Sequence, residues 1–379
     1  MNKVAGSGDL KPDGVHRNSI LMILLTRLSS TTLELGQYRR PFYRLRPAFR
    51  RWSEWCSAVG CAATMLVALE NGYEGRFYRL STIMHRPQTA NAAFGYRILL
   101  PSLAVRLQGM RHSLTDHNAF IATQILAIVA AVVLSGEWAR LFLPRFGQPF
   151  GYAAATLMIC PTINYWTFYD IAIVAFWTGC LLLLYRGKLA LFVVLLAIGT
   201  LNHENTLLLV PCAVAYCWPR MKIGKLFLFT IAQVAAWVLV RALVIHFVPA
   251  GALFDIRIGD NLHFWHFYKA QSLFFAWVVL LPWWALAMLG WRDSPYVLKC
   301  SALSLPGLFL VTFLFGKFDE ARQFAAFTPT CVGLMACLLR QCLLNPNVDE
   351  FAGKPMGNSE RDPVGADNVG NVGPAQILI

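Results

Sequence analysis

The stretch LALFVVLLAIGTLNHENTLLLVPCAVAYC, residues 189–217, decides how this chain folds. Two apolar runs flank a polar centre, and each run has about 12 to 17 residues, fewer than the roughly 20 that a helix needs to cross a bilayer. In one continuous span, Glu204 would lie in mid-helix at a cost of about 2.5–3.5 kcal/mol. We therefore predict a hairpin of two short helices whose polar turn reaches one membrane face.

A second interrupted region precedes this one. Residues 151–184 contain an apolar run, the segment PTINYW at 161–166, and another apolar run, which predicts a second helical hairpin. Basic residues precede, separate and follow the two regions: Arg140, Arg145, Arg186, Lys188, Arg220, Lys222 and Lys225. If both regions are hairpins, these clusters share one side with the basic N-terminus, as expected for cytoplasmic loops.

The composition of the whole chain agrees with a membrane protein. Of 379 residues, 57% are hydrophobic and 14% are charged, with a mean hydropathy of +0.50. Ordinary soluble domains have about 25% charged residues, so this chain has too little polar surface for that class. The net charge of +13 comes from short clusters between apolar runs, and we therefore expect no nucleic-acid partner.

The fold class that follows is all-α: a polytopic helical bundle with about 8–10 membrane segments, including the two hairpins. We expect the longer spans near 54–71, 118–136, 225–248, 272–290, 299–316 and 323–343. Residues 1–53 form a basic cytoplasmic segment in this interpretation, residues 54–343 the membrane domain, and residues 344–379 a disordered polar cytoplasmic tail. We expect the chain to lie in a bacterial inner membrane, with its N-terminus in the cytoplasm and the lipid bilayer as its main partner.

Ionisable and polar residues gather on the face opposite the basic clusters. They end the first span, occupy the long segment after it, mark both hairpin tips and join the last two spans: Glu70, Glu74, Arg97, Tyr169, Asp170, His203, Glu204, Glu320 and Arg322. Such groups persist at membrane depth only when they are buried in protein or line a water-filled cavity. We therefore predict that they wall a wet chamber open to the exterior.

Each residue also has a simpler structural interpretation. Glu204 could pair with Arg97 as a purely structural contact, and Asp170 could cap the helix that follows it. Asp319 and Arg322 could form a local ion pair. Glu70 and Glu74 could have no role other than to mark the membrane boundary. The ten cysteines show neither C-x-x-C nor a Cys/His zinc spacing, which favours buried thiols and no metal or cofactor.

Four pieces of the chain carry a resemblance to a known superfamily. They are FGYRILLP at 94–101, the pair Tyr169-Asp170 ahead of a span, GTLNHENT at 199–206, and Glu320-Ala321-Arg322. Together they resemble polytopic bacterial membrane proteins related to the C-type membrane glycosyltransferases, which use polyprenyl-phosphate sugars. The resemblance extends over residues 54–343.

The resemblance implies an all-helical membrane fold with a large first outer loop. It also implies an acidic residue near the end of the first span, acting as a base or metal contact, for which Glu70 and Glu74 are the candidates. The superfamily's usual adjacent acidic pair containing Asp is not present, since these two glutamates stand four residues apart.

The resulting hypothesis is transfer of a sugar from a lipid-phosphate carrier to an acceptor hydroxyl on the outer face. In it, Glu70 or Glu74 is the general base, and Arg97 and Arg322 hold the donor phosphate. The sugar pocket is shaped by His203, Glu204, Tyr169 and Asp170. Two alternatives remain open: a transporter or flippase without enzymatic activity, since broken helices with charges near the midplane are typical of transporters, and a structural partner in polysaccharide assembly.

Overall fold

The computed structural model describes residues 47–73, 77–87, 96–163, 169–248, 257–262, 271–316 and 321–344. These residues are almost entirely helical and include no strand. The α-helices are α2 (Pro47–Tyr73), α3 (Phe77–His85), α5 (Leu99–Met110), α6 (Asp116–Phe142), α7 (Gly147–Ile159), α8 (Asp170–Tyr185), α9 (Leu189–Asn202), α10 (Leu209–Cys217), α11 (Ile223–Phe247), α12 (Ile258–Leu262), α13 (Gln271–Leu289), α14 (Tyr296–Ser301), α15 (Ser304–Phe315) and α16 (Thr328–Leu344). Short 3-10 turns are η3 (Cys160–Thr162), η4 (Glu204–Leu208), η5 (Trp218–Arg220) and η7 (Ala321–Phe327).

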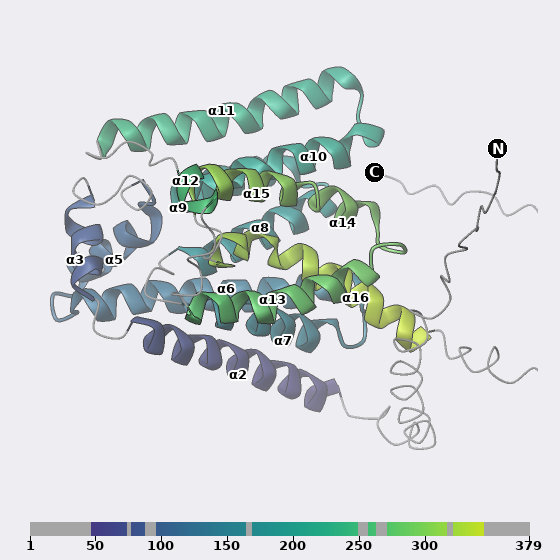
Figure 1. Cartoon of the computed structure of the whole chain (residues 1–379), viewed down its shortest axis with the longest axis horizontal. Coiled ribbons are helices and arrows are strands. Elements are labelled where there is room, and N and C mark those ends of the chain that lie inside the picture. The colour runs from purple at the N-terminus through teal and green to yellow at the C-terminus, as the bar shows by residue number, and fades with distance from the viewer. Residues whose placement is uncertain are drawn as a thin grey trace, which may run out of the picture.

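The predicted fold class is confirmed. Five helical segments are long and apolar enough to cross a membrane, namely Arg51–Gly72, Asp116–Phe142, Ile223–Phe247, Tyr296–Phe315 and Ala321–Leu343. Three shorter apolar helices, Asp170–Tyr185, Leu189–Asn202 and Trp277–Leu289, complete the set. The chain is a helical membrane bundle, and Figure 1 shows its longer helices running roughly along one common direction.

Two boundaries differ from the sequence prediction. Helix α2 begins at Pro47, inside the segment 1–53 that was expected to precede the membrane domain. The span expected over 299–316 is divided into α14 and α15. Pro306 explains this division, because a proline ring clashes with the carbonyl four residues before it, here that of Ala302, and so interrupts a continuous helix. The terminal residues 1–46 and 345–379, including the expected C-terminal tail, lie outside the described residues.

Each of the two interrupted regions contains two short helices, α7 and α8 in the first and α9 and α10 in the second. Helices α7 and α8 are neighbours of α6, and α9 packs on α8, with only residues 143–146 and 186–188 connecting α6 to α7 and α8 to α9. Because consecutive helices joined by such short connections run antiparallel, the turns at 143–146, 186–188 and 218–222 all lie at one end of the bundle. We call this the basic end, after Arg145, Arg186 and Lys222. The opposite end carries Arg97, Asp170 and Glu204, and we call it the site end.

Glycine allows α6 and α7 to pack closely. A Cβ atom on Gly151 would overlap the backbone carbonyl oxygen of Ser135, and one on Gly136 would overlap the Tyr152 ring. Small residues at such interfaces let helix backbones approach, which is how helices gain packing energy where lipid is as apolar as the side chains. This tight pair supports α8, which lies in the middle of the bundle (Figure 1) and is buried along nearly its whole length.

Helices α2 and α11 form opposite edges of the bundle (Figure 1). Each is apolar but mostly exposed, with 17% and 22% of the apolar window buried. The exposed side chains of α11 include Phe227, Leu228, Val238 and Leu239. An apolar face without protein cover is what a lipid-contacting helix presents. Any buried polar residue on α11 must therefore lie on its narrow inner face.

Candidate functional site

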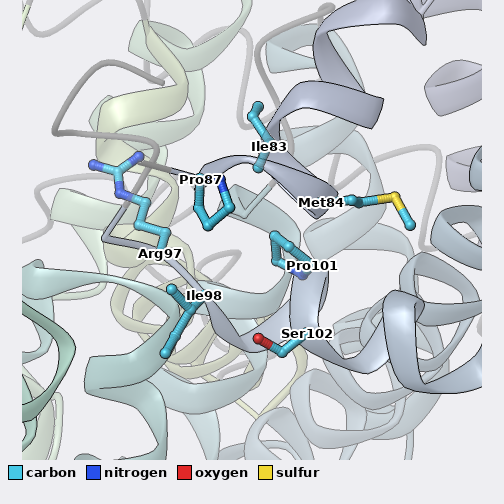
Figure 2. Close-up of a pocket in the computed structure, with 7 residues that line it drawn as sticks. All are labelled: Ile83, Met84, Pro87, Arg97, Ile98, Pro101 and Ser102. Carbon is cyan, nitrogen blue, oxygen red and sulfur yellow. The ribbon is translucent and has the colours of Figure 1, made fainter. Parts of the chain in front are cut away.

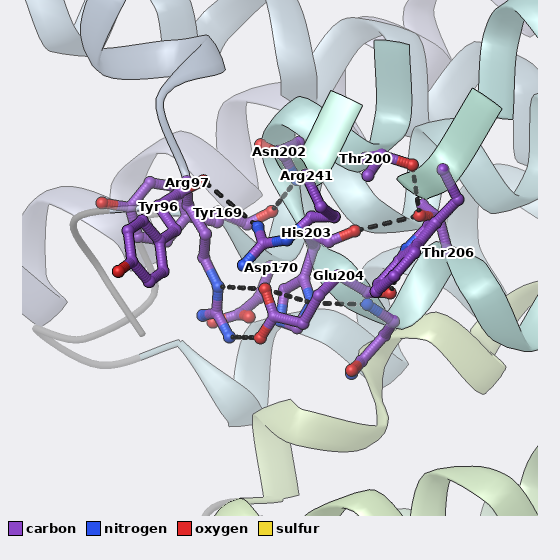
Figure 3. A network of polar contacts seen from close by, with 12 residues as sticks. Tyr96, Arg97, Tyr169, Asp170, Thr200, Asn202, His203, Glu204, Thr206 and Arg241 are labelled. Carbon is purple, nitrogen blue, oxygen red and sulfur yellow. Dashed lines mark hydrogen bonds and ion pairs between the residues drawn. The ribbon is translucent and has the colours of Figure 1, made fainter. Parts of the chain in front are cut away.

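Four distant parts of the chain meet in a polar cluster at the site end, and Figure 3 shows Arg97, Asp170 and Glu204 from this cluster. Arg97 precedes α5, Asp170 begins α8, Glu204 begins the turn between α9 and α10, and Arg322 lies at the start of η7. Two arginine–carboxylate pairs join them, Arg97 with Glu204 and Arg322 with Asp170. The structure thus brings together, from separate segments, residues that the sequence singled out one by one.

The Arg97–Glu204 pair is a bidentate ion pair. Nη2 of Arg97 donates to Oε1 of Glu204 at 2.7 Å, and Nε donates to Oε2 at 3.3 Å. The Arg97 guanidinium also lies 5.6 Å from the centroid of the Tyr169 ring, a distance at which the ring face attracts a cation. The Arg97 side chain is 6% exposed and that of Glu204 is 23% exposed. One edge of this pair therefore remains open to solvent.

Electrostatics keep both members of this pair ionised. Burial disfavours each charge, but the partner's opposite charge outweighs it. As a result the pKa of Glu204 lies well below its ordinary value, and the pKa of Arg97 lies above its own. A carboxylate in this state is a weak base until the arginine is drawn away from it.

The Arg322–Asp170 pair is enclosed. Nη1 of Arg322 donates to Oδ2 of Asp170 at 2.9 Å, and both side chains are 3% exposed. The proposed capping role of Asp170 is wrong in detail, because α8 begins at Asp170 itself and Tyr169 is the capping residue, without a side-chain cap. The carboxylate still lies in the first helical turn, where the helix dipole favours a negative charge. Asp319, the alternative local partner of Arg322, lies outside the described residues.

His203 makes the break between α9 and α10. Its backbone is extended, and its Nδ1 accepts a hydrogen bond from the backbone N–H of Asn205 at 3.2 Å, capping η4. An accepting Nδ1 carries no proton, so the ring is neutral and any proton is on Nε2. His203 is 2% exposed, which makes it a support of the turn that holds Glu204 at the cluster.

Further hydrogen bonds fix this turn to its neighbours. Nδ2 of Asn202 donates to the carbonyl oxygen of Tyr169 at 3.0 Å, which ties the two hairpin tips together. The hydroxyls of Thr200 and Thr206 lie 2.9 Å apart, across the break. Nε1 of Trp237, from α11, donates to the carbonyl oxygen of Glu204 at 3.1 Å. The backbone that presents Glu204 is therefore held from three sides.

Glu70 lies in a different polar patch. Its Oε2 is 3.2 Å from Nε2 of His117 at the start of α6, and a second pair, His85 with Asp116, lies beside it at 3.0 Å. These side chains are 32–44% exposed. No contact joins Glu70 to the Arg97 cluster in the part of the chain that the structure describes, and α2 and α11 lie at opposite edges (Figure 1). Glu74 and Glu320 lie outside the described residues.

Sequence reasoning missed a third arginine of the cluster. Arg241, on α11, is 5% exposed, and its Nη1 donates to the carbonyl oxygen of Tyr96 at 3.4 Å. Its guanidinium lies 5.4 Å from the centroid of the Tyr96 ring. The sequence did contain a signal, because an arginine inside the apolar run VLVRALVI at 238–245 is costly unless it faces protein or water.

A small cleft of about 20 Å³ opens beside the cluster, between α3 and α5. Figure 2 shows its wall, formed by Ile83, Met84, Pro87, Arg97, Ile98, Pro101 and Ser102. The lining is mostly apolar, with Arg97 as its cationic member. An apolar cleft that borders a guanidinium suits an amphiphile, a molecule with an anionic group on an apolar chain.

No family model, no curated protein and no solved structure matches this chain.

The described residues include no group of three His, Cys, Asp or Glu side chains placed to hold a metal ion. What the cluster offers is cationic hydrogen-bond donors, one partly accessible carboxylate and an apolar entrance. Guanidinium groups bind phosphate and carboxylate oxygens in pairs. A carboxylate near a bound hydroxyl can accept its proton.

Proposed function

We propose that this chain transfers a sugar from a lipid-phosphate carrier to an acceptor hydroxyl at the extracytoplasmic face of a bacterial inner membrane, with its N-terminus in the cytoplasm. The observation that supports this most is the Arg97–Glu204 pair, a 2.7 Å ion pair with an exposed edge, next to an apolar cleft. Placing charges in a bundle costs more than filling the same space with apolar side chains. This cost favours a role in binding or catalysis over one in stability alone.

The proposed reaction begins with an exchange of partners at Arg97. A phosphate oxyanion of the donor competes with Glu204 for the guanidinium, which can hold two phosphate oxygens at once. Glu204 then loses the positive charge that made it a weak base. In this scheme the released carboxylate becomes the base for the acceptor, a role that the sequence hypothesis had given to Glu70 or Glu74.

The chemical step is a displacement at the anomeric carbon of the sugar. The acceptor oxygen forms a bond to that carbon, and the bond from the carbon to the phosphate oxygen breaks. The electron pair of the broken bond goes to the phosphate, where Arg97 stabilises the developing charge. The acceptor proton goes to Glu204, which must lie within hydrogen-bond reach of the hydroxyl.

The remaining predicted residues take different parts in this proposal. Tyr169, Asp170 and His203 are almost fully buried, so we assign them to positioning Arg97, Arg322 and Glu204 rather than to direct sugar contact. Glu70, paired with His117, stays an alternative base only if donor binding closes the two patches together. Glu74 and Glu320 keep the proposed roles of base and substrate contact.

One feature favours a second candidate, a flippase or transporter for the same lipid-linked class. Helices α9 and α10 are separated by a 3-10 turn that carries His203 and Glu204 into the cluster. Helices broken at a charged site are a common element of transporters. The two candidates share a ligand but differ in whether a glycosidic bond is made.

The test is sugar transfer in membranes that contain the full chain and a labelled polyprenyl-phosphate sugar. We expect Glu204→Gln and Arg97→Lys to abolish incorporation of label into glycan at unchanged protein levels. The matched control is Glu137→Gln, because Glu137 forms a pair of the same 2.7 Å length with Arg140 at the basic end. Full activity of Glu204→Gln would exclude Glu204 as the base. Label that crosses the bilayer without being transferred would favour the flippase.

A further inference from the structure

Arg241 differs from the other two arginines of the cluster in having no acidic partner. Arg97 pairs with Glu204 and Arg322 pairs with Asp170, whereas no carboxylate lies within ion-pair distance of Arg241 in the described part of the chain. His203 does not add a charge to this balance, because its Nδ1 accepts a hydrogen bond. Glu204 attracts Arg241 only from beyond ion-pair distance, and a 95% buried guanidinium with no carboxylate in direct contact is an expensive arrangement.

The few contacts that Arg241 does make are weak. Within the described residues it makes one hydrogen bond, to the Tyr96 carbonyl, which is long at 3.4 Å, although a guanidinium has five N–H donors. The Tyr96 ring adds a cation–π contact at 5.4 Å. None of the Arg241 nitrogens is both fully enclosed and without a partner. The guanidinium nitrogens that make no hydrogen bond to described residues therefore keep a small solvent-accessible surface.

The position of Arg241 on α11 directs it at the site. Gln233, Trp237 and Arg241 are four residues apart and share one helix face, and this face is the inner one of a helix that is otherwise lipid-exposed. Trp237, one turn before Arg241, already bonds the Glu204 carbonyl. Figure 3 shows the Arg241 guanidinium beside Tyr96, the residue next to Arg97, at the rim of the same cluster.

We propose that Arg241 is an anion-binding residue that holds a phosphate oxyanion next to Arg97. Two neighbouring guanidiniums can each donate to a different oxygen of one phosphate. Arg241 would then add a second positive charge beside the phosphate once Glu204 has been displaced from Arg97. The inference rests on the proposed function only for the identity of the phosphate carrier, since the lack of a carboxylate at ion-pair distance from Arg241 is a property of the described site itself.

The test is equilibrium binding to the purified full chain in detergent. The probes are a short polyprenyl monophosphate, the matching uncharged polyprenol, inorganic phosphate and phosphatidylglycerol. We expect the monophosphate to bind the unchanged chain. Arg241→Gln should lower the affinity for the monophosphate at least tenfold, and Arg241→Lys should give an intermediate affinity. Lys225→Gln is the matched control, because it removes the same charge from an exposed position of the same helix. The affinity of Lys225→Gln for polyprenyl monophosphate should equal that of the unchanged chain.

A stability measurement separates binding from a structural role. If Arg241 only supports the fold, Arg241→Gln lowers the midpoint of thermal unfolding without ligand. If Arg241 binds an anion, Arg241→Gln leaves the midpoint of thermal unfolding without ligand unchanged or raises it. Addition of polyprenyl monophosphate then raises the midpoint of the unchanged chain but not that of the variant.

The outcomes distinguish this inference from the proposed function. Equal binding by Arg241→Gln and the unchanged chain, or no binding of any phosphate probe, would overturn the inference. Arg241-dependent binding of phosphate by a chain that transfers no sugar would support the inference and contradict the proposed function. Binding of phosphatidylglycerol as tight as that of the polyprenyl probe would support Arg241 but identify an ordinary lipid headgroup as the source of the phosphate.

Discussion

The two arginine–carboxylate pairs of the site are alike in chemistry and differ in surroundings. Arg97–Glu204 and Arg322–Asp170 have N–O distances of 2.7 and 2.9 Å. The carboxylate of the first is 23% exposed, whereas both members of the second are 3% exposed. An exposed edge lets a ligand or water take the place of the partner. An enclosed pair has no such substitute, so its loss lowers the free energy of unfolding.

This difference assigns separate tasks to the two pairs. Asp170 opens the central helix α8 and Arg322 opens η7, which leads into α16, so their contact joins two core elements. Arg97 and Glu204 both lie in connections between helices, where a change of partner disturbs little packing. Replacing each carboxylate by its own amide tests the assignment, because shape is kept and only charge is lost.

Asp170→Asn is expected to have the largest effect on stability. Breaking a fully buried ion pair from one side typically costs about 3–5 kcal/mol, because water cannot replace the lost carboxylate. The measurement is the free energy of unfolding in mixed detergent micelles. Adding Arg322→Gln to this variant should recover part of the loss, since no unbalanced charge is then left in the pair. A single variant as stable as the unchanged chain would show that the pair is not a structural contact.

Glu204→Gln is expected to cost less, about 1–3 kcal/mol. The amide oxygen can still accept one hydrogen bond from Arg97, and solvent reaches the open edge. The same unfolding assay measures this value against that of Asp170→Asn. A loss equal to or greater than that of Asp170→Asn would contradict the division of tasks and assign a structural role to both pairs.

The sequence predicted one of these pairs and missed the other. The pairing of Glu204 with Arg97 was expected as a structural alternative to a role in binding, because both residues were placed on the same membrane face. Asp170 and Arg322 stand 152 positions apart, and local chemistry offered each a nearer use, a helix cap or the neighbouring Asp319. Tertiary packing of α8 against η7 decided between them, and no spacing rule contains that information.

Other differences between sequence and structure have local causes. The hairpins followed from the length of the apolar runs, since a half-length run cannot span the bilayer. The break between α14 and α15 was missed, although Pro306 signalled it, because average hydropathy does not register one proline. Arg241 was missed because it lies inside the apolar run 238–245. Arg241 belongs to the cluster because it lies on the buried inner face of α11, a helix that is otherwise exposed to lipid.

The smallest effect is expected at the exposed patch, which serves as the reference for both buried pairs. Glu70 and His117 are 3.2 Å apart with side chains 41% and 35% exposed, and solvent-exposed pairs contribute about 0–1 kcal/mol. Glu70→Gln should therefore change the free energy of unfolding by less than about 1 kcal/mol. If Glu204 is the base, this variant should also retain sugar transfer in the labelled-donor assay. Loss of transfer with unchanged stability would reverse the assignment, because it would make Glu70 the base and leave the Arg97–Glu204 pair as the holder of the donor.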